Sequence, residues 1–138
     1  MKFDANCIFC KIVAGQVPCT KLYEDEDVLA FLDINPVTYG HTLVISKEHY
    51  STFLSTPKGI MNKVMNVAQR IGQVQIEQLG AKGVNILINS YEAAGQVVPH
   101  FHVHVIPRYT AKDGFRLEFK ELKDVNLPKV AEEIKDNL

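Results

Sequence analysis

Apolar and polar residues recur along the chain with two periods, one typical of strands and one typical of helices. Five short segments are rich in branched or aromatic residues and are bounded by Gly, Pro or acidic turn residues. We predict that these segments are strands, and they span residues 21–24, 28–32, 41–46, 83–90 and 100–106. Pro107 directly follows the last segment and is expected to end it, because proline cannot donate to a strand ladder.

Three further segments have helical spacing. A short helix is predicted over residues 7–14 and ends at Gly15, while a long helix is predicted to begin at Ser55-Thr56-Pro57 and to stop at Gly80. The long helix carries two apolar stripes, and the second one indicates a partner subunit, with the strand at residues 83–90 sharing the contact. A last helix is expected over residues 126–138. The apolar residues that it would turn toward a core are Leu127, Val130, Ile134 and Leu138.

Short strands joined by turns, together with one long amphipathic helix, predict an α+β fold. We expect an antiparallel sheet of about five strands, covered on one side by the long helix, with a short N-terminal helix in addition. No repeat, low-complexity segment or Gly/Ser-rich linker interrupts the 138 residues. A single domain over residues 1–138 is therefore expected.

Composition narrows the class of ligand. The chain is 46% hydrophobic and 22% charged, and its net charge is −1 from 15 basic and 16 acidic residues. These values are typical of a globular protein. Without a basic excess we expect no nucleic acid partner, whereas a small anionic ligand remains open because a few local donors suffice to bind it.

The sequence carries no signal for export or membrane insertion. The first fifteen residues contain no apolar stretch of the length found in signal sequences, and no other apolar run is long enough to cross a membrane. Three cysteines, an odd number, argue for a reducing compartment and against a disulfide framework. We therefore expect a cytoplasmic protein without a membrane partner.

The most informative segment is His100-Phe101-His102-Val103-His104. Side chains alternate across a strand, so the three imidazoles are expected on one face and the apolar residues on the other. Such histidines either hold a catalytic metal or work as a nucleophile with orienting neighbours. Gly95-Gln96 lies just upstream, where exposed N–H groups can grip an anion, and this favours the nucleophile.

The alternating histidines, followed by Val105-Ile106, resemble the motif of the histidine triad (HIT) family, and the chain as a whole resembles its Hint-type branch. The resemblance covers residues 7–108, and the tail over residues 109–138 resembles bacterial members. Besides the triad, the segments that carry the resemblance are residues 8–9, 11–12, 23–25, 29–34, 41–49 and 89–108.

The resemblance implies a reaction. In this family the middle histidine attacks the α-phosphorus of a nucleotide, and water then hydrolyses the nucleotidyl-imidazole. His102 is thereby implied as the nucleophile, His104 as a proton donor or charge stabiliser, and His100 as its catalytic neighbour. The phosphate contacts that the resemblance implies are the backbone N–H groups from Gly95 to Val98, the Gln96 amide and Asn89.

The resemblance places the nucleoside against the first half of the chain. Asp33 matches a residue that accepts hydrogen bonds from both ribose hydroxyls, although the residues alone favour a turn carboxylate before Asn35-Pro36. An apolar slot for a purine is also part of the core, so those two interpretations are compatible. The residues that match the purine slot are Ile8, Phe9, Ile12, Phe31, Leu32 and Ile34.

The chain departs from the pattern of its relatives at three places. Val97 stands where many relatives have a Ser or Thr hydroxyl that serves a leaving group or a phosphate oxygen, which places efficient phosphoramidate cleavage in doubt. Leu32 stands where relatives often carry histidine. The chain has no Trp, so the Trp-bearing C-terminus of the branch is absent.

Cys7-Ile8-Phe9-Cys10 is a C-x-x-C pair at the start of a predicted helix. Alone it is a weak signal, because redox motifs use the same spacing and two nearby cysteines can be a coincidence. Some bacterial members of the family hold zinc on such a pair plus two histidines, which here implies His49 and His100 as the other ligands. Four such ligands leave no open position, so the zinc would be structural. Cys19 has no partner in this scheme.

These expectations combine into one function with alternatives. The chain is expected to be a homodimeric purine-nucleotide hydrolase or transferase that forms a nucleotidyl-histidine, with phosphoramidates or aminoacyl-adenylates as substrates. The alternatives are a dinucleoside polyphosphate hydrolase and a nucleotide-binding sensor that barely turns over. A zinc hydrolase that uses the triad as metal ligands is a further alternative.

Overall fold

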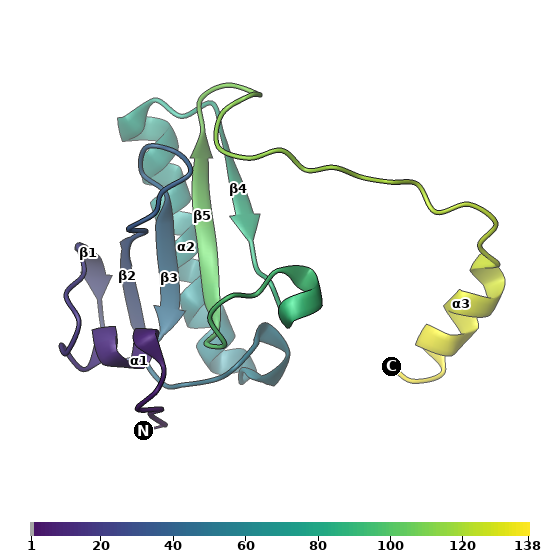
Figure 1. Ribbon diagram of the computed structural model, residues 1–138, viewed down its shortest axis with the longest axis horizontal. Coiled ribbons are helices and arrows are strands. Elements are labelled where there is room, and N and C mark those ends of the chain that lie inside the picture. The colour runs from purple at the N-terminus through teal and green to yellow at the C-terminus, as the bar shows by residue number, and fades with distance from the viewer. Residues whose placement is uncertain (1) are drawn as a thin grey trace.

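The computed structural model describes residues 2–138, and its centre is one antiparallel sheet of five strands (Figure 1). The strand order is β1-β2-β3-β5-β4, so β1 and β4 form the edges. Helix α2 covers one face, and the short helix α1 lies at one end of β1 to β3 (Figure 1). The strands are β1 (Lys21–Glu24), β2 (Val28–Leu32), β3 (Thr42–Ser46), β4 (Gly83–Leu87) and β5 (His102–Arg108). The predicted α+β sheet is confirmed.

Both predicted helices of the first eighty residues are present. Helix α1 (Ile8–Val13) begins at Cys7, whose Sγ accepts the Cys10 N–H. Helix α2 (Lys58–Leu79) begins after Pro57 and ends at Gly80, which takes the left-handed conformation with φ 76°. No side chain caps its start, and Ser55 and Thr52 close their own 3₁₀ turn, η1 (Phe53–Ser55), with hydrogen bonds between them.

Alternation along the strands divides the apolar residues between the two faces of the sheet. On the face under α2, buried Val28, Ala30 and Val44 pack with residues of α2 such as Val64 and Ala68. The opposite face packs against α1, and its buried apolar residues are Cys7, Phe9, Cys10, Leu29, Phe31, Leu43 and Ile45. Phe101, Val103 and Val105 belong to the α2 face, which leaves the histidine side chains of β5 on the α1 face.

Four predicted strand ends are wrong. β3 begins one residue after His41, and β4 ends at Leu87 rather than at residue 90. β5 begins only at His102 and runs through Pro107, which pairs with Val84. β3 accompanies β5 only as far as Val105. Beyond that point β5 has a neighbour on one side, and a strand with one free side tolerates proline.

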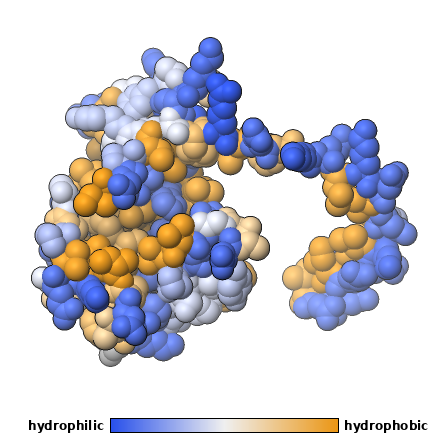
Figure 2. Space-filling view, viewed as in Figure 1, coloured by the Kyte–Doolittle hydropathy of each residue, from blue (hydrophilic) through white to orange (hydrophobic). Residues whose placement is uncertain are grey.

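The last 23 residues leave the sheet as an arm, residues 116–138, that ends in helix α3 (Leu127–Lys135) (Figure 1). Every residue of this arm is exposed. The helix was expected, but its core-facing stripe was not found: Leu127 is 71% exposed and Ile134 56%. Figure 2 shows this apolar face uncovered, away from the sheet. Among residues 2–138, no helix is long and apolar enough to span a membrane.

Candidate active site and metal centre

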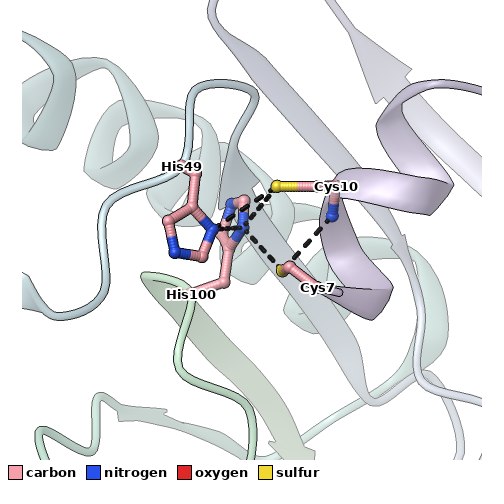
Figure 3. Close-up of side chains that lie close together, drawn as sticks. All are labelled: Cys7, Cys10, His49 and His100. Carbon is pink, nitrogen blue, oxygen red and sulfur yellow. Dashed lines mark hydrogen bonds between the residues drawn. The ribbon is translucent and has the colours of Figure 1, made fainter. Parts of the chain in front are cut away.

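Two cysteines and two histidines, far apart in sequence, converge where α1 meets the sheet (Figure 3). Cys7 and Cys10 come from the start of α1, His49 from the segment after β3, and His100 from the residues just before β5. The Nδ1 atom of His100 lies 3.3 Å from Cys7 Sγ, 3.6 Å from Cys10 Sγ and 3.2 Å from His49 Nδ1. We call these four residues the Cys-His cluster.

The surroundings of the Cys-His cluster favour metal ligation. The Nε2 atom of His100 lies 2.7 Å from the Ser46 carbonyl oxygen, so Nε2 carries the proton and Nδ1 turns a lone pair toward the cysteines. Backbone N–H groups of Asp4 and Cys10 donate to the two sulfur atoms. Burial raises the pKa of the Cys10 thiol, so a thiolate there needs a cation beside it.

The spacing of these atoms also matches a tetrahedral ion. Ligand atoms about 2.3 Å (sulfur) and about 2.0–2.1 Å (nitrogen) from zinc lie about 3.3–3.8 Å from one another. Four of the ligand-to-ligand distances measured here fall between 3.2 and 3.6 Å. Two thiolates and two neutral imidazoles are the donor set of a closed, structural zinc site.

His102 follows directly on β5 and is 7% exposed. Its Nδ1 atom lies 2.6 Å from the His100 carbonyl oxygen and must donate to it, which leaves a lone pair on Nε2. Among residues 2–138, this Nε2 has no hydrogen-bond partner and is not sealed off from solvent. Burial lowers the pKa of His102, so the ring is neutral near pH 7. These contacts leave the Nε2 lone pair of a neutral imidazole accessible to a ligand.

A second group, the Asp-His cluster, lies at the other side of His102. It consists of Asp33 after β2, His41 before β3 and His104 on β5. His41 Nε2 lies 2.9 Å from His104 Nδ1 and 3.5 Å from Asp33 Oδ2. The His102 and His104 rings are in contact, with centroids 5.0 Å apart. Burial lowers the pKa of His104 to about 4, so this ring is also neutral near pH 7.

The loop before the triad is held by a side chain that we expected to contact phosphate. The Gln96 amide nitrogen donates to the Ser51 carbonyl at 2.7 Å, and its oxygen accepts the Tyr91 N–H at 2.8 Å. The backbone N–H groups of Gly95 and Gln96 donate to carbonyls within the same loop. Gln96 therefore shapes this loop in the structure, and Asn89 is joined to it through a long 3.5 Å bond to the Gly95 carbonyl. The Val97 side chain is 89% exposed.

The structure divides the residues expected around a purine. Phe9 and Phe31 are in edge contact on the α1 face, 5.8 Å between centroids, with Ile12 packed beside them. Leu32 turns to the α2 face and lines a groove of about 680 Å³ that Asp33 also borders. Ile8 is 42% exposed and Ile34 is 91% exposed. The Asp33 carboxylate accepts the Asn35 N–H, as a turn residue does, and also faces His41.

Sequence reasoning missed His41 as a site residue, although it lies in the segment 41–49 that resembles relatives and is one of only five histidines. It is 4% exposed. The pattern of apolar residues around it indicated only a strand, and nothing in that pattern shows that its ring meets His104. Its position depends on the pairing of β3 with β5, in which Leu43 lies opposite His104.

Comparisons with known proteins agree with this geometry. A family model described as the HIT domain matches residues 14–111, which include both clusters except the two cysteines. Adenylylsulfatase HINT3 of Arabidopsis thaliana is 43% identical over 103 residues, which are 75% of this chain and 52% of that protein.

Two solved structures extend the likeness to three dimensions. A crystal structure of a HIT family protein from Bacillus anthracis is 43% identical, covers 97% of this chain and 98% of its own, and superposes with a TM-score of 0.90. A Zn-bound histidine triad family protein from Mycobacterium smegmatis is 43% identical, covers 86% of this chain and 84% of its own, and gives a TM-score of 0.74.

Proposed function

Because this chain belongs to the histidine triad family, we propose that it is a purine-nucleotide hydrolase or transferase that acts at the α-phosphorus. The observation that supports this most is the free Nε2 lone pair of His102, fixed by the 2.6 Å bond from Nδ1 to the His100 carbonyl. A neutral imidazole with a fixed, accessible lone pair is a nucleophile that works near pH 7.

The proposed reaction has two steps. His102 Nε2 bonds to the α-phosphorus while the bond to the leaving group breaks. The neutral His104 stabilises the charge that develops on the departing atom, and that atom takes its proton from water. Water then attacks the same phosphorus and loses a proton to the solvent, and the bond between phosphorus and Nε2 breaks to release the nucleotide and the free imidazole. The N–H groups of Gly95 and Gln96 already donate to carbonyls of their own loop. The donors assigned to the phosphate oxygens are therefore the next two N–H groups, those of Val97 and Val98.

The nucleoside part is assigned to the α1 face. Phe9 and Phe31, with Ile12 and the neighbouring Ile8, are assigned to the base, and Asp33 to the ribose hydroxyls. Leu32 lies on the α2 face and Ile34 lies in an exposed turn, so both are assigned to the rim of the nucleoside site. An aromatic edge pair together with a half-buried carboxylate suits a purine nucleoside.

The leaving group is the less constrained part of the proposal. A relative named as an adenylylsulfatase supports an adenylyl group as the part transferred. Val97 offers no hydroxyl to an amine leaving group, which favours leaving groups that need little protonation, such as acyl, sulfate or phosphate. Steady-state rates on an adenosine phosphoramidate, an aminoacyl-adenylate analogue and a dinucleoside polyphosphate will rank the three classes. A negligible rate on all three would support a nucleotide sensor instead.

The decisive test is the covalent intermediate. After incubation with an adenosine phosphoramidate and rapid acid-free quenching, mass spectrometry of the intact protein should detect a nucleotidyl adduct, and peptide mapping should place it on His102. The His102→Asn variant is the matched control and should show none. Turnover without an adduct in the wild type, or an adduct retained in the variant, would contradict the proposal.

Zinc belongs to the proposal as a structural ion on Cys7, Cys10, His49 and His100. The ligand geometry supports it, and a relative from M. smegmatis is Zn-bound. When bound, the ion would hold α1 against the residues that lead into β5, and it would neutralise the two thiolates. Protein purified without chelator should contain close to one zinc per chain. Absence of metal by elemental analysis would contradict this part.

A homodimer is the last part of the proposal. β4 is an edge strand, and Ile86 on it and Ile76 on α2 are 45% and 42% exposed. The arm extends past the β4 side of the sheet (Figure 1). The 115 residues before the arm are about 0.83 of the chain, so a TM-score of 0.90 to the B. anthracis protein requires the arms to superpose as well. An exposed arm with a common position is expected to rest on a second copy.

Light scattering of the full chain tests the dimer. The expected mass is twice 15.5 kDa at micromolar concentration. Leu127→Asp with Ile134→Asp, two exposed positions of α3, should weaken the dimer without lowering the stability of the sheet domain. A monomeric mass for the unmodified chain would contradict the proposal.

A further inference from the structure

Tyr91, in the loop between β4 and β5, has a strained backbone conformation. Its φ is 71° and its ψ is 162°, a region that is open to glycine and almost closed to bulky side chains. Among residues 2–138, the other non-glycine residue with positive φ is Asp124, and aspartate tolerates the left-handed region. Backbone strain persists only where the surrounding structure imposes it, and it concentrates at functional sites.

Gln96 holds this conformation from both sides of Tyr91. Its Oε1 atom accepts the Tyr91 N–H at 2.8 Å, and its own N–H donates to the Tyr91 carbonyl at 3.1 Å. The Nε2 atom of Gln96 donates in turn to the carbonyls of Ser51 and Val98, at 2.7 and 3.1 Å. Tyr91 is therefore fixed to the loop that carries the N–H groups assigned to the phosphate.

The register of the strands places this loop beside the proposed nucleophile. Leu87, the last residue of β4, lies opposite His104. Continued by two residues, the same antiparallel register brings Asn89 level with His102. Because the strand order is β1-β2-β3-β5-β4, the loop lies on the β4 side of His102, whereas the nucleoside site assigned to Asp33 lies on the β2 side.

The Tyr91 ring is not part of the core. It is 61% exposed, and Val97 in the same loop is 89% exposed. Ile88, just before the loop, packs against the core under α2 instead. The strain at Tyr91 is therefore not offset by burial of its side chain, and it holds an aromatic ring at the surface beside the site.

We propose that Tyr91 is a specificity-determining residue whose ring contacts the leaving group and favours one with an aromatic or apolar body. This inference rests on the proposed function and narrows the substrate class within it. Because the nucleoside lies on the β2 side of His102, the part of the substrate beyond the phosphorus is the part that reaches the β4 side. A tyrosine ring offers a rigid apolar face, on which a second ring can stack.

Melting temperatures test the strain. Tyr91→Gly and Tyr91→Ala both remove the ring, but only glycine adopts this φ and ψ freely. The glycine variant should therefore melt about 3 °C above the alanine variant. Equal melting temperatures would overturn the proposal, because the backbone would then carry no strain.

Kinetics test the contact with the leaving group. The substrates are two adenosine phosphoramidates whose leaving amines have similar basicity, 2-phenylethylamine and n-butylamine. In kcat/KM, the wild type should prefer the phenyl substrate about fivefold, Tyr91→Phe should keep this preference, and Tyr91→Ala should lose it. Tyr39→Ala, which removes an exposed tyrosine between β2 and β3, is the matched control and should keep the preference.

Binding and mass measurements separate the possible roles of the ring. AMP affinity of Tyr91→Ala should stay within about twofold of the wild type, because AMP carries no leaving group. A preference retained in Tyr91→Ala, or a large loss of AMP affinity, would overturn the proposal and leave the proposed reaction intact. A monomeric mass for this variant alone would make the ring a dimer contact and would also overturn it. If the wild type cleaves neither substrate and forms no adduct, the proposed reaction fails and this role of Tyr91 fails with it.

Discussion

The Cys-His cluster and the Asp-His cluster lie on the same face of one sheet, and each brings two histidines within 3.2 Å of each other. They differ in the backbone group that contacts His100 in one cluster and His41 in the other. The Ser46 carbonyl accepts the Nε2 proton of His100, so Nδ1 of that ring has a lone pair for a cation. The Val37 N–H donates to Nδ1 of His41, so the proton of that ring is on Nε2 and can be donated.

This difference teaches that a histidine pattern does not specify its chemistry without the backbone partners of the rings. His102 lies between the two clusters and depends on both. The His100 carbonyl, which belongs to a proposed zinc ligand, accepts the proton of the His102 Nδ1 atom, and the His104 ring is in contact with the His102 ring. The predictions below separate these contributions.

The largest expected effect is a loss of turnover when His102, the residue between the two clusters, is replaced. His102→Ala should lower turnover by ~10³-fold or more, because the nucleophile of a covalent mechanism is lost. Calorimetric titration with AMP should show that binding is retained. A variant with near wild-type turnover would show that the reaction does not pass through this imidazole.

Disrupting the Cys-His cluster should lower the stability of the protein more than its catalytic rate. Cys10→Ser removes one zinc ligand and should lower the free energy of unfolding by about 3 kcal/mol, or the melting temperature by about 10 °C. Cys19→Ser, at the remaining cysteine, is the matched control and should change melting by only a degree or two. Equal effects of the two substitutions would mean that no metal contributes to stability.

Asp33 belongs to the Asp-His cluster, and its substitution should change nucleotide binding. Asp33→Asn should weaken AMP binding about tenfold through loss of charged hydrogen bonds to the ribose. The loss should be small for 2′,3′-dideoxy-AMP, which lacks both hydroxyls. Similar losses for the two nucleotides would indicate that Asp33 acts only on its neighbour His41.

The smallest effect is a pH dependence of stability. Burial lowers the pKa of His104 to about 4, whereas an exposed histidine titrates near 6.5. Between these values the unfolded chain binds a proton that the folded chain does not, so stability falls as the pH falls, by about 1 kcal/mol per pH unit. Urea unfolding at pH 7 and pH 5 should show a smaller decrease for His104→Asn than for the wild type. Zinc release at acidic pH affects both proteins and cancels in this comparison.

Much of the fold could be predicted because its signals are local. The strands over residues 21–24 and 28–32 have the predicted bounds, and the long helix stops at Gly80 because glycine takes the left-handed conformation there. The end of β5 could not be predicted, since proline is tolerated only where β3 has already stopped. The apolar stripe of α3 predicted a helix, but periodicity does not specify which chain buries it.

The site divides in the same way. The triad and the cysteine pair could be singled out as candidates from spacing and resemblance, because their residue types are chemically distinctive, and the structure brings His100 close to both cysteines. The expected contact of Gln96 with phosphate stays a prediction, whereas the hydrogen bond from its amide to the Ser51 carbonyl, 45 residues away, could not be predicted from the sequence. His41 was missed for a similar reason: its contact with His104 depends on the pairing of two strands.

The most direct test of the central contrast is anomalous diffraction at the zinc edge, from crystals of the full chain soaked in excess Zn²⁺. The account predicts one strong peak bounded by Cys7, Cys10, His49 and His100, with zinc about 2.3 Å from sulfur and about 2.0–2.1 Å from nitrogen. It predicts no peak between Asp33, His41 and His104. Zinc in the Asp-His cluster would contradict the assignment of a metal to one pair of histidines and a proton to the other.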